Sequence, residues 1–105
     1  MIYSTTETIP GQEIEQVLGV VTGNVVQAKH VGRDIMAGLK SIVGGEIRGY
    51  TEMLTDARNI AVTRLVESAR LKGADAVVGV RFTTSSIMAN SSEIMVFGTA
   101  VKFKP

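Results

Sequence analysis

The apolar positions in the first third of the chain follow the pattern of β-strands. Residues 2–5 predict a short strand and residues 6–12 a turn, and residues 13–28 form a longer stretch rich in valine. Gly19 and Gly23 interrupt this stretch, which indicates bulges, bends or the close approach of another backbone segment.

Successive side chains of a strand point to opposite faces of its sheet. The long stretch therefore places Ile14, Leu18 and Val20 on one face and Val17 and Val21 on the other. Apolar side chains are expected on both faces of this strand.

The spacing of the apolar residues changes from strand-like to helical over residues 33–43. Five apolar residues share one stripe there: Ile35, Met36, Leu39, Ile42 and Val43. The pair Gly44-Gly45 is expected to end this first helix.

A second, longer helix is predicted over residues 51–72. Its apolar stripe consists of Met53, Leu54, Ala57, Ile60, Ala61, Leu65 and Ala69. Thr51 is the expected N-cap, with Glu52 in the first turn. Gly73 suits the position just past the last turn, because glycine readily adopts the left-handed backbone conformation found there.

Two further strands, over residues 74–88 and 93–104, complete the chain, with a turn over residues 89–92 between them. The order of elements is therefore β-β-α-α-β-β, in one domain of residues 1–105. The predicted fold class is α+β, with two layers: an antiparallel sheet of about four strands and two helices.

The final strand is apolar on both sides. Its residues divide into a set that points one way (Met95, Phe97, Val101 and Phe103) and a set that points the other way (Ile94, Val96 and Ala100). Two helices cover about one face of such a sheet, and a large apolar patch on the other face usually marks an interface. We therefore expect a homo-oligomer with closed symmetry. The alternative is a strand pair that folds over to form its own two-layer core.

Composition narrows the classes of partner. The chain has 11 basic and 10 acidic residues, so it lacks the basic field that attracts nucleic acid or anionic membranes. No apolar run approaches the ~20 residues that span a bilayer, and the first residues lack the pattern of a signal peptide. Cysteine is absent, which excludes disulfides and thiolate metal sites. We expect a cytoplasmic protein that binds neither nucleic acid nor membrane.

Three motifs together resemble the YbjQ-like family: KSIVGGEIRGY between the predicted helices, LKGADAVVGV after the second helix, and FGTAV near the end. The resemblance covers essentially the whole chain. It implies a dodecin-like α/β subunit assembled as a homo-pentamer, with two stacked pentamers as an open alternative. The family carries a heavy-metal-binding label, so a metal ion is the one cofactor that the resemblance implies. The residues themselves identify no cofactor.

Soft metals prefer Cys, Met or His ligands, and few are available. His30 is the single histidine and lies at a strand-to-helix junction, where a structural role competes with a role as proton carrier or metal ligand. Met36, Met53 and Met95 lie on apolar faces and are expected in the core. A carboxylate site between subunits remains open.

The glycine-rich segment between the predicted helices contains three candidate ligand-binding residues, Glu46, Arg48 and Tyr50. A flexible loop could present these side chains to a ligand, with free backbone N–H groups for an anion. The simpler interpretation, which we prefer, is that the glycines turn the chain between two packed helices.

Two arginines complete the ligand-binding candidates. Arg33 opens the first predicted helix, where it could bind an anion or pair with Glu46 or a neighbouring subunit. Arg58 lies near the apolar stripe of the second helix, and a buried or inter-subunit salt bridge to Glu46 or Glu52 is the hypothesis for it. The sequence predicts no catalytic residue.

Three functions remain. The first is a non-enzymatic oligomeric module that binds a small molecule or a metal ion at subunit interfaces or in a central pore. The second is a structural ring that serves as a scaffold for a protein partner. The third is an enzyme that uses Glu46, Tyr50 and an arginine across an interface, and it ranks last because no acid–base or nucleophile arrangement is visible.

Overall fold

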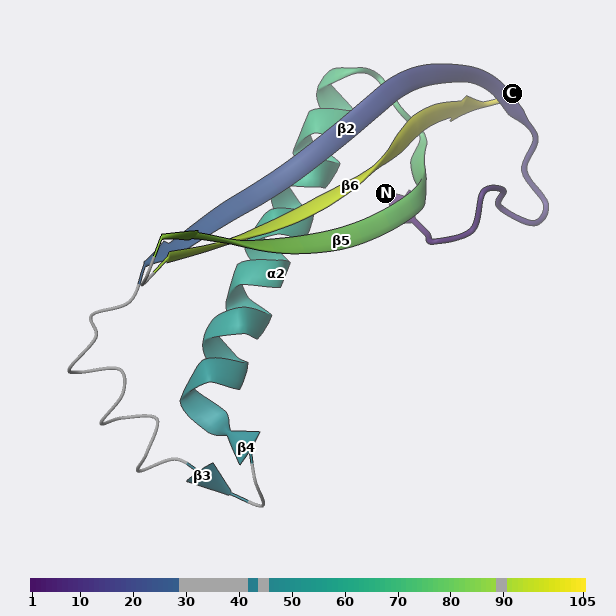
Figure 1. Cartoon of the computed structure of the whole chain (residues 1–105). Helices are drawn as coiled ribbons and strands as arrows, with labels where there is room; N and C mark the ends of the chain where they lie inside the picture. Colours follow the sequence, from purple (N-terminus) through teal and green to yellow (C-terminus); the bar gives the residue numbers. More distant parts are fainter. Residues whose placement is uncertain (29–41, 44–45, 89–90) are drawn as a thin grey trace.

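The computed structural model of the chain describes residues 1–28, 42–43, 46–88 and 91–105 (Figure 1). Its main sheet has four strands in the order β1-β5-β6-β2. Their bounds are Ile2–Tyr3 for β1, Ile14–Ala28 for β2, Ala76–Met88 for β5 and Ser91–Phe103 for β6. The three long strands are antiparallel, as expected, whereas β1 runs parallel to β5 and makes the sheet mixed.

Helix α2, Arg48–Leu71, crosses one face of the sheet and is the single helix among the described residues (Figure 1). It confirms the second predicted helix but begins three residues earlier, so Thr51 lies inside it and is not the N-cap. Gly49 lies in its first turn, and a helix of 24 residues tolerates the ~1 kcal/mol that glycine costs relative to alanine.

The end of α2 follows the prediction for Gly73. This glycine has a φ of 77°, and its N–H donates to the carbonyl of Arg70, while the N–H of Ala74 donates to the carbonyl of Ala69. These two bonds form a Schellman motif, which satisfies carbonyls that the helix itself leaves without partners.

The first predicted helix lies mostly in residues 29–41, outside the described residues. Its last two residues are not helical: β3, Ile42–Val43, pairs antiparallel with β4, Glu46–Ile47. The first predicted helix was expected to run through Ile42 and Val43 up to the pair Gly44-Gly45. That expectation is wrong for Ile42 and Val43, which form a strand. A glycine pair equally favours a two-residue connection between antiparallel strands, and the paired residues Val43 and Glu46 flank that pair.

The core between α2 and the sheet is built on small side chains. A row of helix residues spaced four apart faces the sheet, and all are fully buried: Ala57, Ala61, Leu65 and Ala69. Residues four apart lie on one side of a helix, so this row presents mostly methyl groups to the strands. The sheet meets it with a second buried set: Val21, Val25, Val77, Val80, Ile94, Val96 and Ala100.

Gly23 of β2 lies directly under this row. A Cβ atom at Gly23 would overlap the backbone of α2, at the carbonyl oxygen of Ala61 and the nitrogen of Leu65. Two polar side chains of the helix also reach β2: Arg64 donates to the carbonyl of Asn24 at 2.7 Å and Ser68 to that of Thr22 at 3.3 Å. The helix therefore lies close along β2 and occupies two carbonyls of its outer edge.

The face opposite α2 has a second, smaller core at one end. Ala76, Val78 and Val101 are buried there under Ile9, Ile14 and Phe103. Register shifts in β2 change the expected division of its side chains, because each bulge adds a residue that reverses the alternation. Val17 and Val20 thus share this face and are 64% and 68% exposed, while Leu18 packs toward α2.

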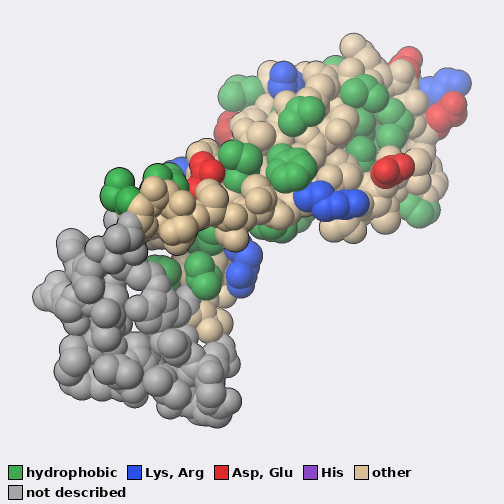
Figure 2. All heavy atoms as spheres, viewed as in Figure 1, with side chains coloured by type: hydrophobic (Ala, Val, Ile, Leu, Met, Phe, Trp, Pro, Cys, Tyr) green, Lys and Arg blue, Asp and Glu red, His purple; other side chains and the backbone are tan. Residues whose placement is uncertain are grey.

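The far end of β5 extends beyond both cores. Its near half, residues 76–80, is buried or half-buried, whereas residues 81–88 are all exposed; we call these eight residues the exposed arm. The radius of gyration of the chain is 17.1 Å, against about 13 Å for a compact domain of this size. Figure 2 shows the face opposite α2, with hydrophobic side chains exposed along its length.

Gly23→Ala is expected to lower the free energy of unfolding by about 1–3 kcal/mol, the usual cost of overpacking, because the helix backbone must move away from the added methyl group. Urea denaturation followed by circular dichroism measures the change. Asn24→Ala is the control, since that side chain is exposed and loses a single bond, to Glu93. Equal midpoints for Gly23→Ala and the parent would contradict the close contact.

Candidate functional site

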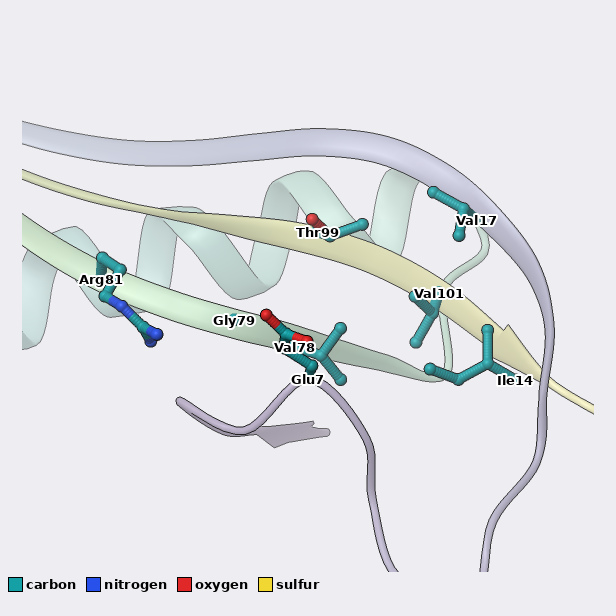
Figure 3. A pocket seen from close by; sticks show the side chains of 8 residues that line it. All are labelled: Glu7, Ile14, Val17, Val78, Gly79, Arg81, Thr99 and Val101. Carbon is teal, nitrogen blue, oxygen red and sulfur yellow. The ribbon is translucent and has the colours of Figure 1, made fainter.

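A cavity of about 380 Å³ lies on the face of the sheet opposite α2, between the sheet and the N-terminal segment (Figure 3). Its floor is aliphatic and comes from Ile14, Val17, Val78 and Val101. Its polar lining consists of Glu7, Arg81 and Thr99, together with the backbone at Gly79. Three strands and the N-terminal segment contribute these residues, so the cavity exists only in the folded chain.

The N-terminal segment is held to β5 beyond the two residues of β1. Ser4 donates to the carbonyl of Val77 and accepts at its own carbonyl from Val80, and the N–H of Gly79 donates to the carbonyl of Thr6 at 2.8 Å. Gly79 has a φ of 62° at a register shift between β5 and β6. Left-handed backbone favours glycine, so this residue allows the bulge that forms one wall of the cavity.

Arg81 reinforces this attachment. Its Nη1 donates to the carbonyl of Thr5 at 3.0 Å and to that of Val80 at 2.9 Å. The side chain bends over the strand into the cavity (Figure 3). Arg81 therefore joins the N-terminal segment to the sheet and brings a positive charge to an otherwise aliphatic floor.

Sequence reasoning missed this site. One signal was available in the sequence. Arg81 is the single charged residue between Ala76 and Met88, and a charged side chain in a largely apolar strand usually has a partner or a ligand. The other walls gave no signal, because they come from segments far apart in the sequence.

The residues predicted from the glycine-rich segment lie elsewhere. Glu46 belongs to β4, and Arg48 and Tyr50 lie in the first turn of α2. Arg33 and His30 lie outside the described residues. At its described positions, the segment predicted as a loop therefore forms a short strand and the first turn of α2. It is far in sequence from the residues that line the cavity.

Arg58 lies ten residues after Arg48 in α2, which separates the two by about 15 Å along the helix axis. Its side chain is exposed, and its Nη2 donates to Thr55 Oγ1 at 3.2 Å. A pair with Glu52 is not among the ion pairs of the described residues, which join Arg70 to Glu67 and Lys104 to Glu13 on the surface. The structure thus does not bring Arg58 together with Arg48 and Tyr50, and its part in binding remains a prediction.

The described residues do not fit a heavy-metal site within one subunit. No group of three or more His, Cys, Asp or Glu side chains lies close enough there to hold a metal ion. The sequence has no cysteine and one histidine, so the ligands that soft metals prefer are scarce. The described part of the chain also contains no helix that is long and apolar enough to cross a membrane.

Comparison with known proteins gives one consistent family. Residues 1–104 match the YbjQ-like family, whose description reads "putative heavy-metal-binding". A UPF0145 protein of Colwellia psychrerythraea is 83% identical over 104 residues, which is 99% of each chain. A UPF0145 protein of Thermotoga maritima is 56% identical over 104 residues, 99% of this chain and 98% of that one. These relatives carry no name that assigns an activity.

A solved structure supports the fold. The crystal structure of a protein of unknown function from Pediococcus pentosaceus, assigned to the DUF74 family, superposes with a TM-score of 0.73. The match covers 99% of this chain and 98% of that chain at 16% sequence identity, so it bears on the fold alone.

Arg81→Ala is expected to loosen the N-terminal segment, because it removes the bond to the carbonyl of Thr5. If the free energy of local opening falls by about 1 kcal/mol, the segment opens roughly fivefold more frequently. Hydrogen exchange at the amides of Gly79 and Val80, which donate to that segment, measures the change. Arg70→Ala, on the surface of α2, is the control and leaves both amides unchanged. Unaltered exchange in Arg81→Ala would show that the segment does not depend on this arginine.

Proposed function

This chain belongs to the YbjQ-like family, and we propose that it is a non-enzymatic cytoplasmic module that binds a small ligand as a subunit of a cyclic homo-oligomer. The observation that carries the assembly is the exposed arm. Eight consecutive residues of β5 are exposed on both faces in a strand whose near half is buried. The arm includes Phe82, Ile87 and Met88, which are between 48% and 65% exposed.

The outer edge of the arm is also open. Within the described residues, the N-terminal segment pairs with β5 at residues 76–80, and beyond them only the Arg81 side chain contacts it. The arm sequence, RFTTSSIM, has no proline, lysine or acidic residue. Proline and charged side chains are devices by which edge strands usually resist pairing with other chains, and the arm has one charge, Arg81, and one register shift, between Ser86 and Met88.

The edge of β2 offers a contrast within the same sheet. Arg64 and Ser68 of α2 occupy the carbonyls of Asn24 and Thr22 there. The chain itself occupies two carbonyls of one edge, whereas the other edge is open along the arm, which favours a second copy of this chain as the occupant of the arm.

A ring follows if the arm of each copy packs on a different surface of the next, because such head-to-tail contacts close into cyclic symmetry. Five copies is the number that the family resemblance implies. The ligand-binding part of the proposal rests on the cavity beside Arg81, which is lined by Val78 and Gly79 of the near half of β5 and by the first residue of the arm.

A scaffold ring without a ligand is the second candidate, favoured by the same arm but not by the cavity. An enzyme that uses Glu46, Tyr50 and an arginine across an interface ranks third, because no acid–base or nucleophile arrangement is visible in the sequence.

Native mass spectrometry of the purified chain tests the assembly, with a mass of five 11.2 kDa chains expected. Phe82→Lys places a charge in the arm and is expected to weaken association at least tenfold, so that the monomer dominates at micromolar concentration. Leu71→Lys is the matched control, since Leu71 is a still more exposed apolar residue outside the arm, at the end of α2.

A monomeric parent would overturn the assembly. An intact Phe82→Lys oligomer together with a dissociated Leu71→Lys oligomer would move the interface from the arm to the helix end. Circular dichroism confirms that both variants are folded. A thermal-shift screen with metal ions and metabolites tests ligand binding. If no compound in the screen raises the melting temperature, the scaffold function is favoured.

A further inference from the structure

Two side chains of opposite charge line one cavity without pairing with each other. Glu7 reaches it from the N-terminal segment and Arg81 from β5, and both are drawn toward the same space (Figure 3). The ion pairs of the described residues do not include them. Two complementary charges that do not pair, beside an aliphatic floor, suit a molecule that carries both signs.

Arg81 has donors to spare. A guanidinium group carries five N–H donors, and both hydrogen bonds of Arg81 in the described chain use Nη1. Nη2 and Nε are left for a ligand, and two adjacent N–H groups of a guanidinium bind a carboxylate through two parallel bonds. Because Nη1 is fixed by the carbonyls of Thr5 and Val80, the guanidinium is positioned before a ligand arrives.

Glu7 determines which carboxylates fit. Its side chain has no hydrogen bond or ion pair within the described residues, so its carboxylate is left for a ligand. A simple anion bound at Arg81 would be repelled by this carboxylate. An anion that also carries an ammonium group would bind both residues, because the ammonium group donates to Glu7.

The aliphatic floor of the cavity indicates which kind of side chain the ligand carries. Val17, Val78 and Val101 present branched aliphatic groups and no polar side-chain atom, so they favour an aliphatic group over a polar one. The cavity, about 380 Å³, lies at the small end of the range for ligand sites, roughly 300–1,000 Å³. A ligand of amino-acid size fits within this volume.

We propose that this cavity binds an α-amino acid with a branched aliphatic side chain: its carboxylate on Arg81, its ammonium group on Glu7 and its side chain on the valine floor. The proposal rests on the small-ligand function proposed above, and it names the site and the ligand class.

The test is calorimetric titration of the full chain with three probes of one shape. L-Leucine carries both charges, isocaproate lacks the ammonium group, and isoamylamine lacks the carboxylate. Leucine is expected to bind, and each truncated probe is expected to bind about tenfold to hundredfold more weakly, since isocaproate loses the bond to Glu7 and isoamylamine loses the bonds to Arg81.

Glu7→Gln is the decisive variant, because Glu7 makes no contact within the described chain on which the fold depends. It is expected to weaken leucine binding at least tenfold and to strengthen isocaproate binding, so that the preference between the two probes is lost. Arg81→Lys is expected to weaken leucine and isocaproate alike, and circular dichroism shows whether it is folded. Glu67→Gln, on the surface of α2, is the control and changes neither affinity.

Three outcomes separate this proposal from the one before it. An intact oligomer that binds another compound of the thermal-shift screen but not leucine overturns the amino-acid site and leaves the binding function standing. An oligomer that binds no compound at all overturns both. Leucine binding that Glu7→Gln does not alter places the amino acid outside this cavity and also overturns the inference.

Discussion

The contact between Gly23 of β2 and the backbone of α2 determines how the rest of the chain is arranged. A helix normally rests on a sheet through side chains, but at Gly23 the strand presents none, and the row from Ala57 to Ala69 presents mostly methyl groups. The two backbones therefore approach closely enough for Arg64 and Ser68 to reach the edge carbonyls of β2. The helix is fixed to one edge of the sheet, and the opposite edge lies beyond its reach.

Because α2 lies toward one edge, different parts of the sheet have different surroundings. Where α2 covers one face, the other face is free to form a second core under Ile9 and to hold the cavity beside Arg81. Beyond residue 80 neither α2 nor the N-terminal segment covers β5, and the strand continues exposed to Met88. The near half of β5 is therefore packed in the two cores, whereas its far half is exposed.

Several features set by local sequence were predicted, although Thr51 is not the N-cap of α2 and Ile42–Val43 is a strand. The long strands and α2 follow from apolar periodicity, and the end of α2 follows from Gly73, whose left-handed φ is a local requirement. Features set by insertions or distant contacts were not. The bulge near Gly19 moves Val17 and Val20 to one face, which alternation alone cannot anticipate. The Gly44-Gly45 pair suits a hairpin as well as a helix end. The cavity joins Glu7 to Arg81 across most of the chain, so no local pattern marks it.

The bond from Arg81 to Thr5 joins residues 76 positions apart in the sequence. Contacts of such separation form late, because a long loop must close before they contribute to stability. The pairing of β5 with β6 needs a much shorter loop and can precede it, whereas the pairing of β2 with β6, from Ala28 with Ser91 to Ile14 with Phe103, joins segments about as far apart. Both β2 and the N-terminal segment are therefore expected to join the sheet after β5 has paired with β6. The cavity takes residues from both segments, so a folding intermediate that contains only α2, β5 and β6 would lack it.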